Sequence, residues 1–279
     1  MVWLAPAKIN LFLRVLGKRA DGYHDIFTLM QKISLYDELS FAPLAQGIHL
    51  KCSDLELPTD ENNLVFRAAE LLFSNMGYHG GIEITLNKQI PLAAGLGGGS
   101  SDAASTLMAL NELCSFGLNK KELMQLGSKL GADVSFFIFG NSAFASGIGD
   151  KLKVCKNLPE IQLVLINPQF HLSTKAVYSN LTLRLTSEKI NYSIPRLLTL
   201  GDVIRELHND LEEVSLKMYP ELGDLKQILL RHGALGALMS GSGPTVFGIF
   251  SDEKAARNAS ALIDKEFPGS YSFFFARSL

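Results

Sequence analysis

Cysteine, charge and long apolar runs are all scarce in this sequence of 279 residues. The three cysteines, Cys52, Cys114 and Cys155, lie far apart and in no zinc-ligand or CxxC spacing, which excludes a disulfide framework and favours reduced thiols. No apolar run approaches the length that spans a bilayer, and Met1–Ala7 is too short for a secretion signal. We therefore expect a cytoplasmic protein with no membrane partner.

The charge balance also limits the partners. The net charge is −2 with a pI near 6.3, whereas dedicated nucleic-acid binders are usually basic, so we expect no nucleic-acid partner. A small anionic ligand is not excluded, because a few local donors suffice to bind it. The sequence does not predict an oligomeric state.

Apolar residues make up 47% of the chain, enough for a full core in one large domain or two ordinary ones. The chain turns polar over 151–159, and we place a domain boundary there, giving domains 1–155 and 156–279. The first part is rich in expected strands. The second alternates strands with helices, so the predicted fold class is α+β.

A glycine-rich stretch between an expected strand and an expected helix is the strongest local signal. The alternation over Gly81–Ile90 predicts a strand, and the spacing over Ser101–Phe116 predicts a helix. Glycine lets the backbone approach a ligand closely, and the first N–H groups of a helix attract anions. The stretch therefore predicts a nucleotide phosphate site. Its residues are Pro91, Leu92, Ala93, Ala94, Gly95, Leu96, Gly97, Gly98, Gly99, Ser100 and Ser101.

The alternative is an ordinary turn in which Ser100, Ser101 or Asp102 caps the helix. A cap does not need three consecutive glycines, whose entropic cost on folding is large. The stretch is no Walker A loop, since Gly-Lys-Ser/Thr is absent, and Ser100 stands where the dinucleotide fingerprint has its third glycine.

Other polar residues are candidates for ligand binding because of their positions, and each of them also has an ordinary structural explanation. Lys8 and Asn10 share one face of an expected strand, where a lone lysine is usually a solvated edge residue. Tyr23 and His24 follow an Asp-Gly turn, as a ligand clamp or as a loop anchor with an exposed histidine. Asp133 precedes an apolar run, either as a helix N-cap or as a carboxylate aimed at a ligand.

Several motifs then match one family in order along nearly the whole chain. Three of them resemble the motifs of the GHMP kinases, a superfamily that includes galactose, homoserine and mevalonate kinases: Pro6–Leu11, Pro91–Ser101 and Ser240–Phe247. Four more resemble the diphosphocytidyl-methylerythritol kinases of the non-mevalonate isoprenoid pathway: Ala20–His24, Leu130–Val134, Ser173–Tyr178 and Asn209–Glu212.

The resemblance implies two domains, the first like ribosomal protein S5 and the second ferredoxin-like, with the active site in the cleft between them. It implies an ATP- and Mg²⁺-dependent kinase that phosphorylates a hydroxyl of a cytidine diphosphate derivative of methylerythritol. By position, Asp133 matches the catalytic aspartate and Lys8 the lysine beside it.

The resemblance also assigns the substrate site, in which His24 reads the edge of the cytosine while Tyr23 and Tyr178 stack on it. The implied substrate-binding residues are Asn10, Tyr23, His24, Thr174 and Tyr178. Ser101 is a candidate Mg²⁺ ligand, although no carboxylate partner for it is evident. Ala93 and Ala94 depart from the pattern, since some family members carry glycine there.

Two other functions remain open at this point. One is a GHMP kinase for another small alcohol, which would not need Tyr23, His24 and Tyr178 together. The other is a non-catalytic nucleotide sensor with the same fold, which absence of Lys8 or Asp133 would favour. Both residues are present.

Overall fold

A computed structural model describes residues 2–181 and 194–279. The described chain packs into two compact units, each made of separate stretches. Unit 1 comprises residues 1–7, 35–90 and 97–141, and unit 2 comprises 8–34, 91–96 and 142–279. The predicted domain limits, 1–155 and 156–279, stay a prediction.

Unit 1 is a sheet with helices. Strand β4 (Gly81–Asn87) lies between β3 (Gly47–Cys52), to which it is parallel, and the antiparallel end of β2 (His24–Leu44). The alternation of Ile82, Ile84 and Leu86 buries one face of β4, as the sequence predicts.

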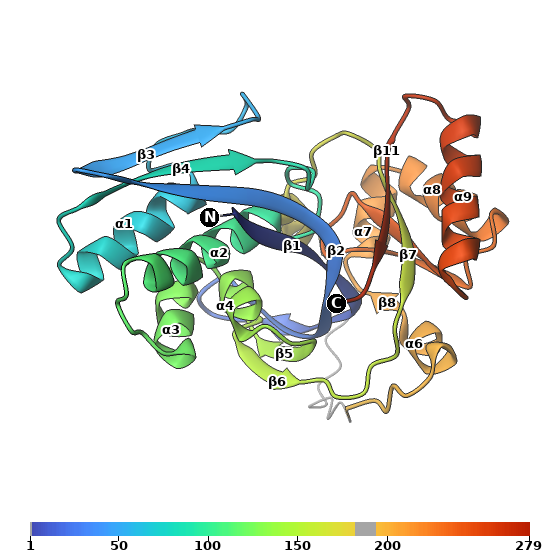
Figure 1. Ribbon diagram of the computed structural model, residues 1–279. Helices are drawn as coiled ribbons and strands as arrows, with labels where there is room; N and C mark the ends of the chain where they lie inside the picture. The colour runs from blue at the N-terminus through green and yellow to red at the C-terminus, as the bar shows by residue number, and fades with distance from the viewer. Residues whose placement is uncertain (1, 182–193) are drawn as a thin grey trace. The chain divides into compact units, whose positions relative to one another are not determined.

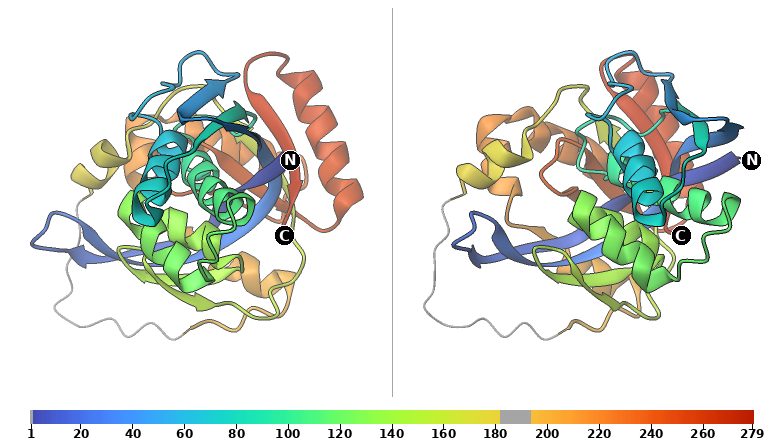
Figure 2. Two further views of the ribbon diagram at one scale, coloured as in Figure 1. Left: turned by 60° about the vertical axis from the view of Figure 1, so that its left-hand side comes forward. Right: turned by 90° about the vertical axis from the view of Figure 1, so that its left-hand side faces the viewer.

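Four helices complete unit 1 and lie side by side in Figures 1 and 2, with α2 against α1 and α4. They are α1 (Leu64–Met76), α2 (Gly98–Leu113), α3 (Lys120–Leu130) and α4 (Ala132–Phe139). The apolar spacing predicts the first of these over 63–76, and the structure confirms the helix with Asn63 as its N-cap, accepting from the N–H of Val65. Asn119, which the sequence predicts as the cap of a helix over 120–130, is confirmed in that place and forms a capping box with Glu122.

Unit 2 contains two groups of strands. In the first, β2 lies between β1 (Val2–Lys18) and β5 (Ala143–Gly147); β6 (Lys151–Val154) pairs with β5, and β8 (His208–Asn209) runs parallel to β1. The second is an antiparallel sheet in the order β11-β7-β10-β9. Its strands are β7 (Gln162–Asn167), β9 (Gly236–Met239), β10 (Val246–Phe250) and β11 (Ser272–Arg277).

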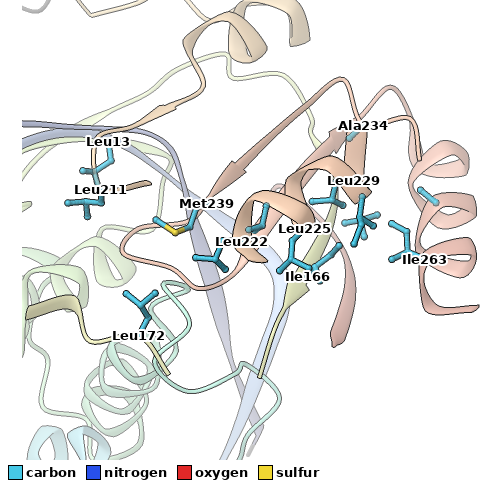
Figure 3. Close-up of a cluster of buried hydrophobic side chains, with 14 of the residues drawn as sticks. Leu13, Ile166, Leu172, Leu211, Leu222, Leu225, Leu229, Ala234, Met239 and Ile263 are labelled. Atoms are coloured by element: carbon cyan, nitrogen blue, oxygen red, sulfur yellow. The ribbon is translucent and has the colours of Figure 1, made fainter. Parts of the chain in front are cut away.

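Helices α8 and α9 pack on one face of the antiparallel sheet. Figure 3 shows Leu222, Leu225 and Leu229 of α8, with Ile263 of α9, in the cluster around Ile166. Burial of such side chains, worth about 1.5–3 kcal/mol each, holds the layers together. The helices of unit 2 are α5 (Thr174–Ser179), α6 (Leu200–Glu206), α7 (Glu212–Met218), α8 (Glu221–Arg231) and α9 (Glu253–Glu266).

Two helix starts differ from the sequence prediction. Helix α2 begins at Gly98 rather than at Ser101. The apolar spacing over 209–219 predicts an amphipathic helix that begins at Asn209, but Asn209 lies in β8 and α7 begins at Glu212. Tertiary hydrogen bonds of the Asn209 amide, described below, hold that residue outside the helix. No helix in 2–181 or 194–279 is long and apolar enough to cross a membrane.

Candidate active site

The glycine-rich stretch leads from β4 into α2, as predicted, but the helix has no ordinary cap. Its N-cap is Gly97, in the left-handed conformation with φ 71°, and no side chain of the described residues accepts a capping hydrogen bond. The alternative that Ser100, Ser101 or Asp102 caps the helix is therefore wrong, since all three lie inside it. Uncapped N–H groups at this end are suited to bind an anion.

The first half of the stretch, Pro91–Leu96, belongs to unit 2 and packs on the second glycine cluster, Ser240–Thr245. The Ser240 hydroxyl donates to the carbonyl of Gly95 at 2.9 Å, and the N–H of Thr245 donates to the carbonyl of Ala94 at 3.4 Å. The backbones are so close that a Cβ on Gly95 would lie 2.1 Å from the carbonyl oxygen of Ser240. Gly95 is required here by packing as well as by its φ of +75°.

Ala93 has a φ of 48°, in the left-handed region that favours glycine. A glycine at this position would adopt the same conformation without strain. The alanine keeps the turn at the cost of some backbone strain.

Lys8 is buried inside unit 2, with only 5% of its surface exposed, so the alternative of a solvated edge lysine is wrong. Its Nζ donates to Asn10 Oδ1 at 2.7 Å, and Asn10 Nδ2 donates to Thr28 Oγ1 at 2.8 Å. The Thr28 hydroxyl donates in turn to the carbonyl of Phe12 at 2.6 Å. This chain of hydrogen bonds fixes the orientation of the Asn10 amide and of the ammonium group.

Lys8 and Asn10 also lie beside both glycine clusters. The N–H of Lys8 donates to the carbonyl of Leu96 at 2.9 Å. A Cβ on Gly241 would lie 3.4 Å from Asn10 Oδ1 and 3.5 Å from Lys8 Nζ. Unit 2 therefore brings a buried cation to the edge of the glycine-rich stretch.

The Asn209–Glu212 motif, whose role the sequence did not show, holds the second glycine cluster in place. Asn209 Nδ2 donates to the carbonyls of Met239 and Gly241 at 2.8 and 2.7 Å, and Glu212 Oε1 accepts from the N–H of Met239 at 2.9 Å. Asp210 Oδ2 accepts from the N–H of Val15 at 2.6 Å, which joins the motif to β1. A polar side chain at a strand end, followed by a helix, is too common a signal to have predicted these long-range contacts.

A pocket of about 600 Å³ in unit 2 brings together four of the five predicted substrate residues: Tyr23, His24, Thr174 and Tyr178. Tyr23 lies in the loop before β2 and His24 is the first residue of β2, whereas Thr174 and Tyr178 lie in α5, about 150 residues further along the chain. This size is typical of small-ligand pockets. Ile26 and Ile148 add apolar surface to the lining.

The rings on the lining of this pocket differ in burial, since Tyr178 is partly buried against the hydrophobic core of unit 2. Tyr23 is 63% exposed, so its ring contributes little to loop stability. The rings of His24 and Tyr178 lie 5.0 Å apart at an interplanar angle of 32°. The predicted stacking of a cytosine on Tyr23 and Tyr178 stays a prediction.

His24 has a pKa below its usual value, because burial disfavours the imidazolium and the Lys18 charge repels it. The ring is therefore neutral at pH 7 and offers one donor and one acceptor. Thr174, the first residue of α5, shares a hydrogen bond of 2.8 Å between its hydroxyl and that of Ser242. This bond joins the pocket to the second glycine cluster.

Asp133 lies in unit 1, in the first turn of α4, after an N-cap at Gly131. The alternative that Asp133 caps the helix is therefore wrong. The Asp133 side chain therefore lies at the N-terminal end of the helix. That Asp133 and Lys8 act in one site stays a prediction.

The comparison with known proteins covers the whole chain. Residues 63–141 match the family model described as "GHMP kinases N terminal domain". Residues 192–269 match the family model described as "GHMP kinases C terminal". A protein of Syntrophus aciditrophicus named 4-diphosphocytidyl-2-C-methyl-D-erythritol kinase is 55% identical, over 99% of this chain and 98% of its own length. The chain belongs to the 4-diphosphocytidyl-2-C-methyl-D-erythritol kinase family.

Other members of this kinase family and the solved structures agree. A protein of Geobacter sulfurreducens with the same name is 46% identical over 93% of each chain. A crystal structure of a 4-(cytidine 5'-diphospho)-2C-methyl-D-erythritol kinase has a TM-score of 0.85 and 35% identity, covering 100% of this chain and 99% of its own. The mevalonate kinase of Methanococcus jannaschii, at 17% identity and a TM-score of 0.74, shares the fold. The predicted α+β GHMP kinase fold is confirmed.

Proposed function

We propose that this family member transfers the γ-phosphoryl group of ATP to a hydroxyl of 4-diphosphocytidyl-2-C-methyl-D-erythritol, the compound in the names of its relatives. The observation that supports this choice of substrate is the pocket in unit 2, which is lined by Tyr23, His24, Thr174 and Tyr178. Exposed rings and a neutral imidazole suit a planar base, and the apolar residues suit its sugar face. A kinase for a simple alcohol has no use for this set.

We assign a different role in phosphoryl transfer to each group of residues. This reaction depends on positioning and charge stabilisation more than on covalent catalysis. We assign the uncapped start of α2 and the glycine-rich stretch to the ATP phosphates. Lys8, held by Asn10, neutralises charge on the transferring group. Asp133 accepts the proton of the attacking hydroxyl.

A magnesium site also fits the residues present. The Ser101 Oγ is buried at the start of α2 and has no hydrogen-bond partner among the described residues. A hydroxyl oxygen is a ligand type that Mg²⁺ accepts together with phosphates and water. Mg²⁺, when bound with ATP, neutralises charge on the phosphates. No cluster of three or more His, Cys, Asp or Glu in the described chain forms a metal site by itself.

The function is tested by phosphoryl transfer from labelled ATP to a panel of alcohols. We expect the cytidine diphosphate compound to be the preferred acceptor and methylerythritol phosphate, which lacks the cytidine group, to be used very poorly. Equal use of the two acceptors would contradict the base-binding role of the pocket. Preference for an unrelated alcohol would contradict the substrate assignment.

Tyr23 gives the clearest test of whether the pocket binds the cytosine base by stacking, because its exposed ring contributes little to the core. We expect Tyr23→Ala to raise KM for the cytidine diphosphate substrate about 5- to 140-fold, since stacking on a base is worth about 1–3 kcal/mol. KM for ATP and the melting temperature should change little. A fall in melting temperature with an unchanged KM would show instead that the ring anchors the loop.

Two lysines on the lining give the pocket a positive charge for the diphosphate. Lys18 and Lys175 form no ion pair within the described part of the chain, whereas Asp21, which also lies on the lining, pairs with Arg19 at 3.0 Å. We expect Lys175→Met to raise KM for the substrate about 5- to 10-fold, the usual scale of one charge-assisted contact. The control is Lys254→Met, on an exposed part of α9, which should leave KM unchanged. Equal effects of the two substitutions would show that only net charge matters.

A further inference from the structure

Three ionisable side chains are buried together in unit 1, where the chain enters and leaves the glycine-rich stretch. Lys88 follows β4, Asp37 lies in β2, and Asp102 is the fifth residue of α2. Their side chains are only 5%, 0% and 2% exposed. None of them has a role in the function proposed above.

Lys88 joins the two carboxylates. Its Nζ pairs with Asp37 Oδ2 and donates to Asp102 Oδ2 at 2.8 Å. Asp37 Oδ1 accepts two further hydrogen bonds, from the N–H of Gln89 at 2.6 Å and from that of Ile90 at 2.8 Å. The triad therefore ties the backbone just before the glycine-rich stretch to the helix just after it.

These ties lie at the points where the chain leaves and re-enters unit 1. It leaves after Ile90 and returns at Gly97. Gly98, the first residue of α2, sits directly on the triad: a Cβ there would lie 3.2 Å from Lys88 Nζ and 3.0 Å from Ile90 Cγ2. The Lys88 ammonium group therefore lies beside the first turn of α2, the turn that we assign to the ATP phosphates.

Stability alone does not explain such a triad, because apolar side chains of similar volume often replace buried ions at no loss. Here burial raises the pKa of the Asp102 carboxyl to about 7, since desolvation outweighs the attraction of Lys88 and Asp37 adds repulsion. Asp102 Oδ1 moreover has no hydrogen-bond partner among the described residues. What the ions provide, and apolar contacts would not, is a directional link between two backbone segments.

We propose that Lys88, Asp37 and Asp102 are positioning residues for ATP. They hold Gln89–Ile90 and the first turn of α2 at a fixed spacing, so that the N–H groups of that turn are preset for the phosphates. The proposal rests on the assignment of this stretch to ATP phosphates. The three side chains act through the backbone, without touching the nucleotide.

The test compares two substitutions of similar size at Asp102. Asp102→Asn keeps an oxygen acceptor for Lys88, whereas Asp102→Leu removes the link and leaves Lys88 paired with Asp37. We expect Asp102→Leu to weaken ATP binding at least tenfold by calorimetry and to raise KM for ATP by a similar factor. KM for the other substrate and kcat should stay within about twofold. Asp102→Asn should stay within about threefold of the wild type in ATP affinity.

Asn111→Leu is the matched control, at the other end of the same helix. Asn111 exchanges two hydrogen bonds with the backbone of Leu118, so its loss destabilises α2 away from the glycine-rich stretch. Asn111→Leu should lower the melting temperature without changing ATP affinity. The proposal is overturned if Asp102→Leu binds ATP with the affinity of the wild type. It is also overturned if Asp102→Asn or Asn111→Leu lowers ATP affinity to the same extent as Asp102→Leu.

Hydrogen exchange without nucleotide separates this proposal from the assignment of the ATP site. Amides of Ser101–Ser105, in the first turns of α2, should exchange faster in Asp102→Leu than in Asp102→Asn or the wild type. If wild-type protein does not bind ATP, the site assignment fails, and the exchange result still decides whether the triad positions this turn. Equal exchange rates in all three proteins would overturn the positioning role.

Discussion

Replacing Asp133 by asparagine is expected to lower kcat by about a hundredfold or more, which is the usual scale for loss of a general base. The amide has the size of the carboxylate but cannot accept a proton from the attacking hydroxyl. ATP should still bind, because the proposed phosphate site lies at the start of α2 and in the glycine-rich stretch. Single-turnover kinetics and ATP calorimetry measure the two effects separately.

Asp224→Asn is the control for this experiment, because Asp224 also lies in the first turn of a helix, α8. Both substitutions remove a carboxylate from a positive helix end, an effect worth about 0.3–1 kcal/mol in stability. Only Asp133→Asn should affect kcat. Near-normal turnover in Asp133→Asn would rule out the assignment of Asp133 as the base.

The second large effect is expected at Gly95, and it concerns stability as well as ATP. Gly95→Ala would place a methyl group 2.1 Å from the carbonyl oxygen of Ser240, on a backbone with φ of +75°. The left-handed conformation and the steric overlap together should destabilise the protein by about 3 kcal/mol, which lowers the melting temperature by several degrees. ATP affinity should fall in parallel, because the two glycine clusters can no longer pack together.

Gly99→Ala is the matched comparison within the same stretch. A Cβ there meets only Leu64 Cδ1, at an ordinary 3.6 Å, and alanine is the better helix former. We expect stability to be equal or higher and ATP affinity to fall if the phosphates approach this backbone. Equal losses of stability at Gly95 and Gly99 would contradict the packing argument, and unchanged ATP affinity in Gly99→Ala would argue against close phosphate approach at that residue.

Local signals in the sequence predicted most of the regular structure. Alternation located β4, apolar spacing located α1, and Asn119 marked the start of α3, because caps and side-chain periods depend on neighbours within a few residues. The glycine-rich stretch was located in the same way. Its helix begins earlier than expected, at Gly98, where Ile90 and Lys88 lie so close to the backbone that a side chain has little room.

Lys8 and the Asn209–Glu212 motif show what local signals could not decide. A strand lysine is usually solvated, yet Lys8 is buried because Asn10 and the neighbouring strand residue Thr28 form a polar chain for it. Asn209 was expected in a helix but its amide binds carbonyls about 30 residues away. Such contacts join segments that are distant in sequence, so no local pattern carries them.

The sequence by itself determined the order of the motifs, the kinase family and which residues are candidates for catalysis and ligand binding. Only the tertiary structure decided that Tyr23, His24, Thr174 and Tyr178 line one pocket, and that Lys88 links Asp37 to Asp102. The physical reason is that residue types set which bonds a side chain can form. Which partner it meets, and whether water is excluded there, depends on how the whole chain packs.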